Sequence, residues 1–319
     1  MKRRRFVKTA AGAAPLIACF PANLSGMYRE FPKGSLEKRA LGKTGEKLSI
    51  LGFGGVVVMD ATPKQASDRV KEAIDYGVNY FDVAPTYGNA ETMLGPALKP
   101  FRKDVFLACK TTERTKAGSR KELEQSLERL KTDHLDLYQL HAVTSLEDVE
   151  TIFGPDGAME TYLEAKKEGK IRFIGFSAHS VEAAMALMDK FDFDTILFPI
   201  NYGTWHAGNF GPQVLERAKE KEMGILALKS MAKRPWPEGE EKIPKCWYEP
   251  LSEPEEASMG LRFTLSHPIT AAIPPGNENL FSMALKLGTK FKPLNADEVM
   301  AMKQKGAAEN PLFKFPMKG

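Results

Sequence analysis

Residues 105–141 read VFLACKTTERTKAGSRKELEQSLERLKTDHLDLYQLH. A short apolar run, Val105 to Lys110, opens this stretch, and a second, Leu135 to His141, closes it. Between them, leucines recur at helical spacing at positions 123, 127 and 130. Short apolar runs bounded by turn residues are typical of strands covered on both faces, so the stretch predicts a strand, a helix and a second strand.

The same alternation runs through most of the chain. Apolar runs occupy residues 48–55, 80–84, 105–110, 135–141, 171–177, 195–201, 224–229 and 269–274. Helical patterns between them include residues 64–76, 119–130, 158–167, 181–191, 212–221 and 255–266. Eight strand–helix units in about 240 residues predict an α/β fold, the (β/α)8 TIM barrel. A doubly wound open sheet is the competitor, but the GxGxxG fingerprint that its first turn would carry is absent from Gly52-Phe-Gly-Gly55.

Three segments depart from this alternation. Two short extended pieces flank Lys43-Thr-Gly-Glu46, which predicts an N-terminal β-hairpin that could plug the bottom of the barrel. Residues 231–254 and the segment after Lys290 are long interruptions, and loops of that length in a compact domain are usually functional or disordered. Trp205, Trp236 and Trp247 fall in the loops of the mouth, where they line a pocket or fold the loops over the barrel.

The charge and cysteine content exclude several classes of protein. The 319 residues hold 45 Lys and Arg against 41 Asp and Glu, and five of the basic residues lie among the first eight. The remainder is nearly neutral, so no nucleic-acid partner is expected. Three cysteines without a CxxC pair give no metal framework, and we expect no metal site. No apolar run approaches the roughly 20 residues of a transmembrane span.

Polar residues at the carboxyl ends of the strands are the candidates for chemistry, because that end of such a barrel carries the active site. Asp82 lies in the second run and Tyr87 just beyond it, while Lys110 closes the third run and His141 the fourth. A phenol is a poor acid unless a nearby cation favours the phenolate. Lys110 would be that cation, Asp82 would hold it in place, and His141 would direct a carbonyl oxygen.

Residues 82–95, DVAPTYGNAETMLG, resemble the aldo-keto reductase signature D-x-A-x-x-Y-G-x-[SA]-E-x-x-[LI]-G. Residues 135–141 and 169–177 resemble the family's next strands, and the resemblance extends in order over residues 39–290. It implies a catalytic tetrad of Asp82, Tyr87, Lys110 and His141. It also implies an enzyme that reduces a small-molecule aldehyde or ketone to an alcohol with hydride from NADPH or NADH, Tyr87 giving the proton.

The resemblance also suggests cofactor contacts, although it is weaker there. The residues that match family positions are Ser177, Asn201, Lys229, Gly276 and Asn277. Glu278 stands where a basic residue usually pairs with the 2′-phosphate of NADPH, so NADH is expected to bind at least as well. Because these cofactor positions match the family less well, a second function stays open. It is a cofactor-binding redox sensor or interaction subunit with negligible turnover, as the potassium-channel β subunits of the family suggest.

The first residues have the layout of a bacterial export signal. Arg3-Arg4-x-Phe6-Val7-Lys8 resembles the twin-arginine consensus, and a mild apolar stretch follows it. Leu16-Ile-Ala-Cys19 resembles a lipobox, and lipidation of Cys19 stays open. We therefore assign residues 1–30 to an export signal and linker, and residues 36–319 to an aldo-keto reductase-like barrel with a C-terminal extension. The location expected is periplasmic or exported, with or without a lipid anchor; a basic tail on a cytoplasmic protein is the alternative.

Replacement of Arg3 and Arg4 by Lys tests the export signal. The twin-arginine machinery moves folded proteins, which suits a barrel that must load a cytoplasmic cofactor before export. The double variant should remain in the cytoplasm, whereas the control Arg5→Lys should be exported normally. Cell fractionation and immunoblotting measure both. An unchanged periplasmic yield from the double variant would defeat the twin-arginine interpretation.

Overall fold

The computed structural model describes residues 36–316 and contains a sheet of eight parallel strands. In order across the sheet they are β3 (Phe53–Gly54), β4 (Tyr80–Asp82), β5 (Phe106–Thr111), β6 (Leu135–Val143), β7 (Ile171–Ala178), β8 (Thr195–Pro199), β9 (Gly224–Leu228) and β12 (Ala271–Ile273). The two edges meet where Leu51 forms a parallel bridge with Ala272. The sheet therefore closes into the predicted (β/α)8 barrel, and each predicted apolar run overlaps one strand of the barrel, the first run also reaching into the preceding strand.

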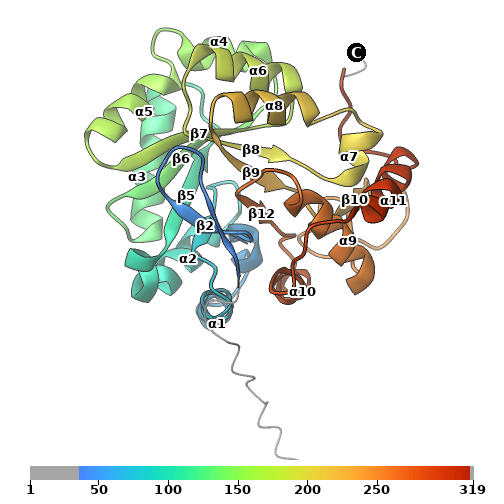
Figure 1. Ribbon diagram of the computed structural model, residues 1–319. Coiled ribbons are helices and arrows are strands. Elements are labelled where there is room, and N and C mark those ends of the chain that lie inside the picture. The colour runs from blue at the N-terminus through green and yellow to red at the C-terminus, as the bar shows by residue number, and fades with distance from the viewer. Residues whose placement is uncertain (1–35, 317–319) are drawn as a thin grey trace, which may run out of the picture. The chain divides into compact units, whose positions relative to one another are not determined.

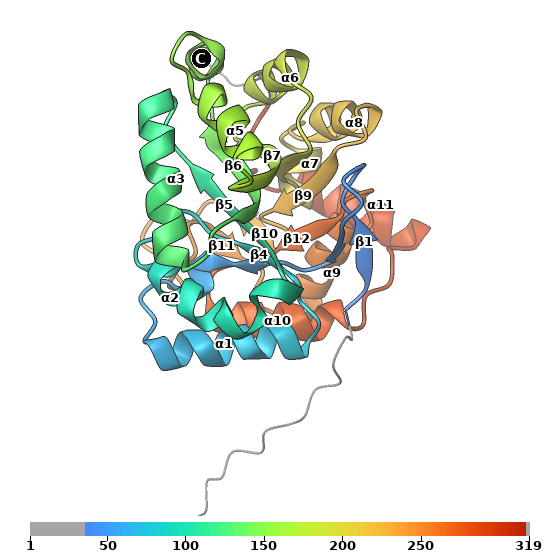
Figure 2. The same ribbon diagram turned by 90° about the vertical axis from the view of Figure 1, so that its left-hand side faces the viewer.

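Helices surround this ring of strands (Figures 1 and 2). The predicted ones are α1 (Pro63–Asp75), α3 (Lys116–Leu130), α5 (Ala158–Lys167), α6 (Val181–Lys190), α8 (Pro212–Glu220) and α9 (Pro254–Leu265), each within three residues of expectation. The structure adds α2 (Ala90–Leu98), α4 (Leu146–Phe153), α7 (Tyr202–His206), α10 (Glu278–Gly288), α11 (Ala296–Ala307) and the 3-10 turns η1 (Gly55–Val58) and η2 (Lys99–Asp104). Local sequence fixes many ends: Thr62 and Gln65 form a capping box that starts α1.

A hairpin closes the N-terminal end of the barrel. Strands β1 (Lys38–Ala40) and β2 (Lys47–Ser49) pair antiparallel, as expected. Leu41 and Leu48 are fully buried in one cluster with side chains from the early part of the barrel strands, such as Tyr80 and Phe106. Figure 1 shows the blue hairpin lying across the ring of strands. The plug predicted from sequence is confirmed, so the opposite end is left for a ligand.

Both long interruptions are ordered around that opposite end. Residues 231–254 contain a two-stranded antiparallel ribbon of β10 (Ala232–Arg234) and β11 (Glu249–Pro250). After α11, the chain returns to the barrel, where Phe315 N donates to the carbonyl oxygen of Gly208 (2.8 Å). The ring of Phe313 lies 5.3 Å from that of His179, just beyond β7. Both segments therefore pack against the barrel near the carboxyl ends of its strands.

Two expectations about the membrane have different outcomes. The export signal assigned to residues 1–30, including Cys19, lies outside the described residues and stays a prediction. Within residues 36–316, none of the helices combines the length and the apolar character needed to cross a bilayer.

Candidate active site

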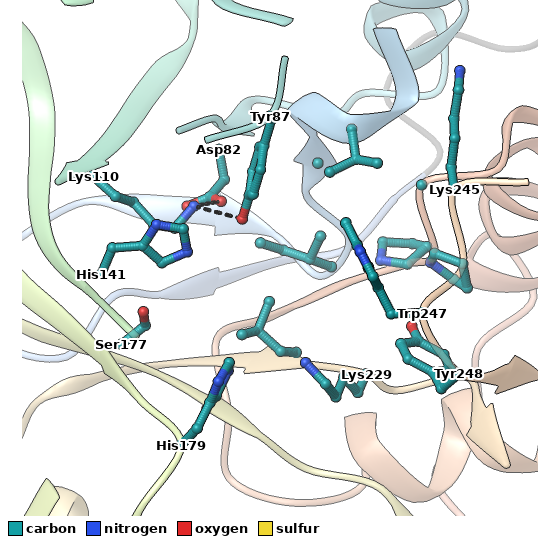
Figure 3. Close-up of a pocket in the computed structure, with 17 residues that line it drawn as sticks. Asp82, Tyr87, Lys110, His141, Ser177, His179, Lys229, Lys245, Trp247 and Tyr248 are labelled. Carbon is teal, nitrogen blue, oxygen red and sulfur yellow. Dashed lines mark hydrogen bonds and ion pairs between the residues drawn. The ribbon is translucent and has the colours of Figure 1, made fainter. Parts of the chain in front are cut away.

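The four predicted catalytic side chains meet at the carboxyl ends of neighbouring strands. Asp82 ends β4, Tyr87 lies in the loop after it, and Lys110 and His141 lie near the ends of β5 and β6. All four line one pocket of about 340 Å³ (Figure 3). The barrel register explains the meeting, because β4 pairs with β5 and β5 pairs with β6.

A buried ion pair anchors the site. Lys110 Nζ contacts Asp82 Oδ1 and donates to the carbonyl oxygen of Val83 (3.3 Å), and both charged side chains are at most 3% exposed. The other carboxylate oxygen, Asp82 Oδ2, accepts from Gln139 Nε2 (3.0 Å) and from Tyr80 OH (3.1 Å). Burial lowers the pKa of Lys110, but the charge and hydrogen bond of Asp82 together with the influence of Tyr87 outweigh burial, and the net pKa is raised. Lys110 is therefore a fixed cation.

Tyr87 presents its hydroxyl to that cation. Lys110 Nζ lies 3.5 Å from Tyr87 OH and 5.1 Å from the centre of its ring. Burial raises the pKa of Tyr87, and the Lys110 charge opposes that effect without cancelling it. The phenol thus keeps its proton at neutral pH, while the phenolate left after proton transfer has a cation beside it.

His141 completes the site as a neutral ring. It meets the ring of Tyr87 edge-on, with 5.8 Å between the centroids and 88° between the planes. Burial, followed by the Lys110 charge, lowers the pKa of His141 to about 2. Its Nδ1 is buried and has no hydrogen-bond partner among the described residues. A neutral imidazole carries one N–H donor and one acceptor, so His141 can hold a polar ligand atom but not act as a cation.

An irregularity in the pairing of β6 with β7 sets the orientation of His141. The pairing of β6 with β7 shifts register between Leu140 and Val143, and Ala142 has a positive φ of 52°. Ala142 N donates to Ser177 Oγ (2.8 Å), and Arg114 Nη2 donates to the carbonyl oxygen of His141 (2.8 Å). Sequence reasoning missed Arg114, whose only signal was a cation in the loop after β5. Ser177 and Arg114 together hold the residue that follows His141 in its uncommon conformation.

The predicted cofactor residues separate into two groups. Ser177, Lys229 and Gly276 line the pocket. Asn201 and Asn277 do not: Asn201 Oδ1 caps α7 at Thr204 N (2.9 Å), and Asn277 Oδ1 caps α10 at its first amides. Asparagine is a favoured N-cap residue, and this role explains the contacts of both Oδ1 atoms, whereas Asn201 Nδ2 is buried and has no partner among the described residues.

The pocket also has a wall that the sequence did not identify. His179, Lys245 and Tyr248 line it, the last two from the long interruption before α9. Of the three tryptophans, only Trp247 is among the lining residues, and it is 69% exposed. Trp236 instead donates its Nε1 to the carbonyl oxygen of Cys246 (2.9 Å), so it folds the loop.

Glu278 is not the isolated carboxylate that the sequence suggested. Arg69 Nη2 lies 2.9 Å from its Oε1, and Lys245 Nζ lies 3.4 Å from its Oε2. Both cations also donate to the carbonyl oxygen of Val57. Burial raises the pKa of Glu278, but its own backbone N–H and the two cations bring the net pKa below the usual value. Two cations therefore already offset the charge of Glu278, and the expectation that NADH binds at least as well as NADPH stays a prediction.

Comparison with known proteins agrees with this geometry. The model of the aldo/keto reductase family matches residues 51–242.

The chain belongs to the aldo/keto reductase family.

Among curated relatives, L-galactose dehydrogenase of Arabidopsis thaliana is 33% identical over 220 residues, 62% of this chain and 66% of that protein. Aldo-keto reductase YhdN of Bacillus subtilis is 30% identical over 217 residues, 62% of this chain and 63% of that protein. The match covers from about half to two thirds of the curated relatives' length.

Solved structures share the fold. Aldo-keto reductase AKR11C1 from Bacillus halodurans, in its holo form, is 23% identical with a TM-score of 0.69, and the match covers 88% of this chain and 99% of that one. An aldo/keto reductase from Klebsiella pneumoniae, solved with NADP and acetate, is 20% identical with a TM-score of 0.67 and covers 89% and 99%. At such identity the likeness supports the barrel alone.

The histidines of this aldo/keto reductase family member should make it sensitive to acid. Burial, followed by the Lys229 charge, lowers the pKa of His179 to about 3 from the ordinary 6.5. Below pH 6.5 the unfolded chain binds a proton that the folded chain refuses. The stability present above that pH is therefore lost as the pH falls toward 3, by up to about 1.4 kcal/mol per pH unit. His179→Asn should lose less stability than the wild type over this range.

Urea unfolding at several pH values between neutral and 4 measures the difference. His134→Asn is the control for a histidine outside the pocket; because His134 contacts Asp133 (2.7 Å) and lowers its pKa, this variant should follow the wild type except at the acid end of the range. Equal slopes for His179→Asn and the wild type would show that His179 is not held neutral by burial.

Proposed function

We propose that this protein reduces an aldehyde or ketone to an alcohol, with Tyr87 as the proton donor. One observation carries the proposal: the Tyr87 hydroxyl lies 3.5 Å from Lys110 Nζ, whose charge Asp82 fixes, in a pocket shared with His141. No metal-binding cluster of His, Cys, Asp or Glu occurs within residues 36–316. The proton transfer is assigned to Tyr87, on the geometry of the tetrad.

The pocket suits a nicotinamide cofactor. Its lining runs from the tetrad to Gly276, immediately before α10, and includes Lys245 beside Glu278. A Cβ at position 276 would lie 2.3 Å from Val56, so glycine keeps the backbone close-packed at the edge of the pocket. Ser177, Gly276 and Lys245 would hold the cofactor, which supplies the hydride when it is bound. Whether NADH or NADPH is preferred depends on the charges around Glu278.

The side chains then divide the remaining chemistry. His141 donates a hydrogen bond to the carbonyl oxygen and orients it. Tyr87 gives its proton to that oxygen as negative charge develops there. The phenolate that remains is stabilised by Lys110, and Asp82 keeps Lys110 charged and in place. Proton uptake from solvent restores Tyr87.

A second function uses the same pocket without turnover. In a cofactor-binding sensor or interaction subunit, the barrel would report the redox state of a bound cofactor. The observation that favours it is the engagement of Asn201 and Asn277 as helix caps and of Ser177 in the β6 bulge. Fewer side chains are then left to orient a cofactor for rapid turnover.

Replacement of Tyr87 by Phe separates the two functions. The change removes one hydroxyl and leaves the ring against His141, so folding and cofactor affinity should survive. Carbonyl reduction should slow by about 10²- to 10⁴-fold, the usual contribution of a general acid. Lys110→Met should cause a loss that is far from additive with it, because the pair acts as one unit.

Oxidation of NADH and NADPH by a panel of aldehydes and ketones measures these rates, and fluorescence titration checks cofactor binding. A wild type that reduces no carbonyl, or a Tyr87→Phe variant that is equally fast, would refute the enzyme and favour the sensor.

Glu278 should set the choice between the two cofactors. The sequence alone favoured NADH, but Arg69 and Lys245 now lie beside Glu278 and are neutralised by it. Glu278→Gln frees two cations for a 2′-phosphate, so NADPH should bind roughly three- to tenfold tighter, with little change for NADH. Lys245→Met should act in the opposite direction. Quenching of tryptophan fluorescence gives both dissociation constants, and an unchanged ratio in both variants would contradict this account.

We further propose that the protein acts after export, as a periplasmic or lipid-anchored enzyme. Support comes from Arg3-Arg4 and the apolar stretch that follows in the sequence. The partner implied is the twin-arginine export machinery, and the route implied is export of a folded, cofactor-loaded barrel.

A further inference from the structure

Lys229 occupies an unusual position on the wall of the pocket opposite the tetrad. It directly follows β9, has a positive φ of 62°, and lines the pocket together with His179 and Tyr248. Its Nζ lies 6.0 Å from the ring of Tyr248 and 5.5 Å from the ring of Phe313. Figure 3 shows its side chain entering the pocket between His179 and Tyr248. The residue is half-buried rather than fully exposed.

Lys229 is a cation of the pocket that has no carboxylate partner. The other two lysines of the lining form ion pairs, Lys110 with Asp82 and Lys245 with Glu278. The Lys229 ammonium forms neither an ion pair nor a hydrogen bond with any of residues 36–316, and its contacts with charged or aromatic groups are the two rings. Asp82 is the only acidic residue that lines the pocket, and Lys110 already neutralises it.

Lys229 is only partly buried, but an ammonium held among apolar and aromatic groups without a counter-charge is still costly. The faces of two aromatic rings offset only part of the cost of taking a lone ion out of water. The cost appears as a lowered pKa, about 8, caused by burial. Lys229 also lowers the pKa of His141 and of His179, so its charge acts on the same space that they face. A backbone in the left-handed region adds conformational cost for a residue that is not glycine.

We propose that Lys229 binds the anionic group of the pocket's ligand, a carboxylate or a phosphate. His179, a neutral ring on the same wall, can donate one N–H to the same anion. The proposal rests on the proposed function in one respect, because the anion belongs either to the carbonyl substrate or to the nicotinamide cofactor. A carboxylated aldehyde or keto acid is the substrate class in the first case, and the cofactor's phosphates are the ligand in the second.

The first experiment needs no turnover. Thermal unfolding of the purified full chain is followed with inorganic pyrophosphate and, separately, with benzoate as probes. Each probe that binds at Lys229 should raise the unfolding midpoint of the wild type, and Lys229→Met should abolish that rise. Without a ligand, Lys229→Met should unfold at the same temperature or higher, because it removes a partly buried charge without a partner. A lysine with a merely structural role would instead destabilise the protein when replaced.

Two further variants control for charge and geometry. Lys233→Met removes a lysine from the same segment that already pairs with Glu249 (2.8 Å), and it should leave the anion shift intact. Lys229→Arg keeps the charge and should restore at least part of the shift. Protection by benzoate, whose charge is constant near neutral pH, should fade as the pH rises above about 8 in the wild type. Of the groups that face Lys229, His141 and His179 are already neutral there, and the pKa of Tyr248 is raised by burial.

The second experiment identifies the source of the anion. If it is a cofactor phosphate, Lys229→Met should weaken both NADH and NADPH by about 10- to 100-fold, the range for one charge-assisted hydrogen bond. If it is a substrate carboxylate, cofactor binding should be unchanged. kcat/KM should then fall by the same factor for 4-carboxybenzaldehyde and stay constant for 4-methylbenzaldehyde.

The outcomes separate failure of this proposal from failure of the proposed function. If neither probe shifts the wild type more than Lys229→Met, and cofactor affinity is also unchanged, Lys229 binds no anion. If the wild type reduces no aldehyde but pyrophosphate protection depends on Lys229, the anion site stands and the reductase does not.

Discussion

The buried pair of Asp82 and Lys110 is the constraint on which the site depends. A lysine this deeply buried is tolerable only with a carboxylate beside it, and the carboxylate in turn needs its other oxygen satisfied, here by Gln139 and Tyr80. Strands β4, β5 and β6 each supply part of this arrangement. The fixed charge then acts in two directions: it favours the phenolate of Tyr87, and it helps to hold His141 neutral. After burial, this one ion pair is thus the strongest influence on the pKa of both groups that would touch a carbonyl oxygen.

Lys110 and Lys229 show how burial of the same side chain leads to two different roles. Both face one pocket, yet the pKa of the first is raised and that of the second is lowered, because only the first has a carboxylate within reach. A charge that the protein neutralises itself is available to tune a neighbour. A buried charge without a partner lowers the stability of the folded protein. An anionic ligand can offset that loss when it binds, so the same charge increases binding affinity.

The sequence predicted the barrel and the tetrad for the same reason. Consecutive strands are neighbours in a parallel barrel, so residues that close consecutive apolar runs, such as Lys110 and His141, must converge. The contact between Arg69 and Glu278 could not be predicted from the order of the strands. Arg69 lies 209 positions from Glu278, and they meet only because closure of the barrel between Leu51 and Ala272 joins its first and last units. At Asn201 and Asn277, the local preference of asparagine for helix starts accounts for the bonds that their Oδ1 atoms form, and their predicted contact with a cofactor stays a prediction.

The bulge after His141 shows what a strand pattern leaves out. An unbroken β6 would alternate its side chains strictly between the barrel interior and the helices, and the direction of every residue near its end would follow from the pleat. The positive φ of Ala142 breaks that alternation just after His141. The break persists because Ser177 accepts from Ala142 N and Arg114 holds the carbonyl oxygen of His141, contacts that come from β7 and from the loop after β5. The hydroxyl of Ser177 would therefore take part in two interactions, one with Ala142 N and one with a cofactor. Its oxygen already accepts a hydrogen bond, and its own hydrogen is what remains to be offered to a cofactor, so the orientation of the cofactor and that of His141 depend on the same side chain.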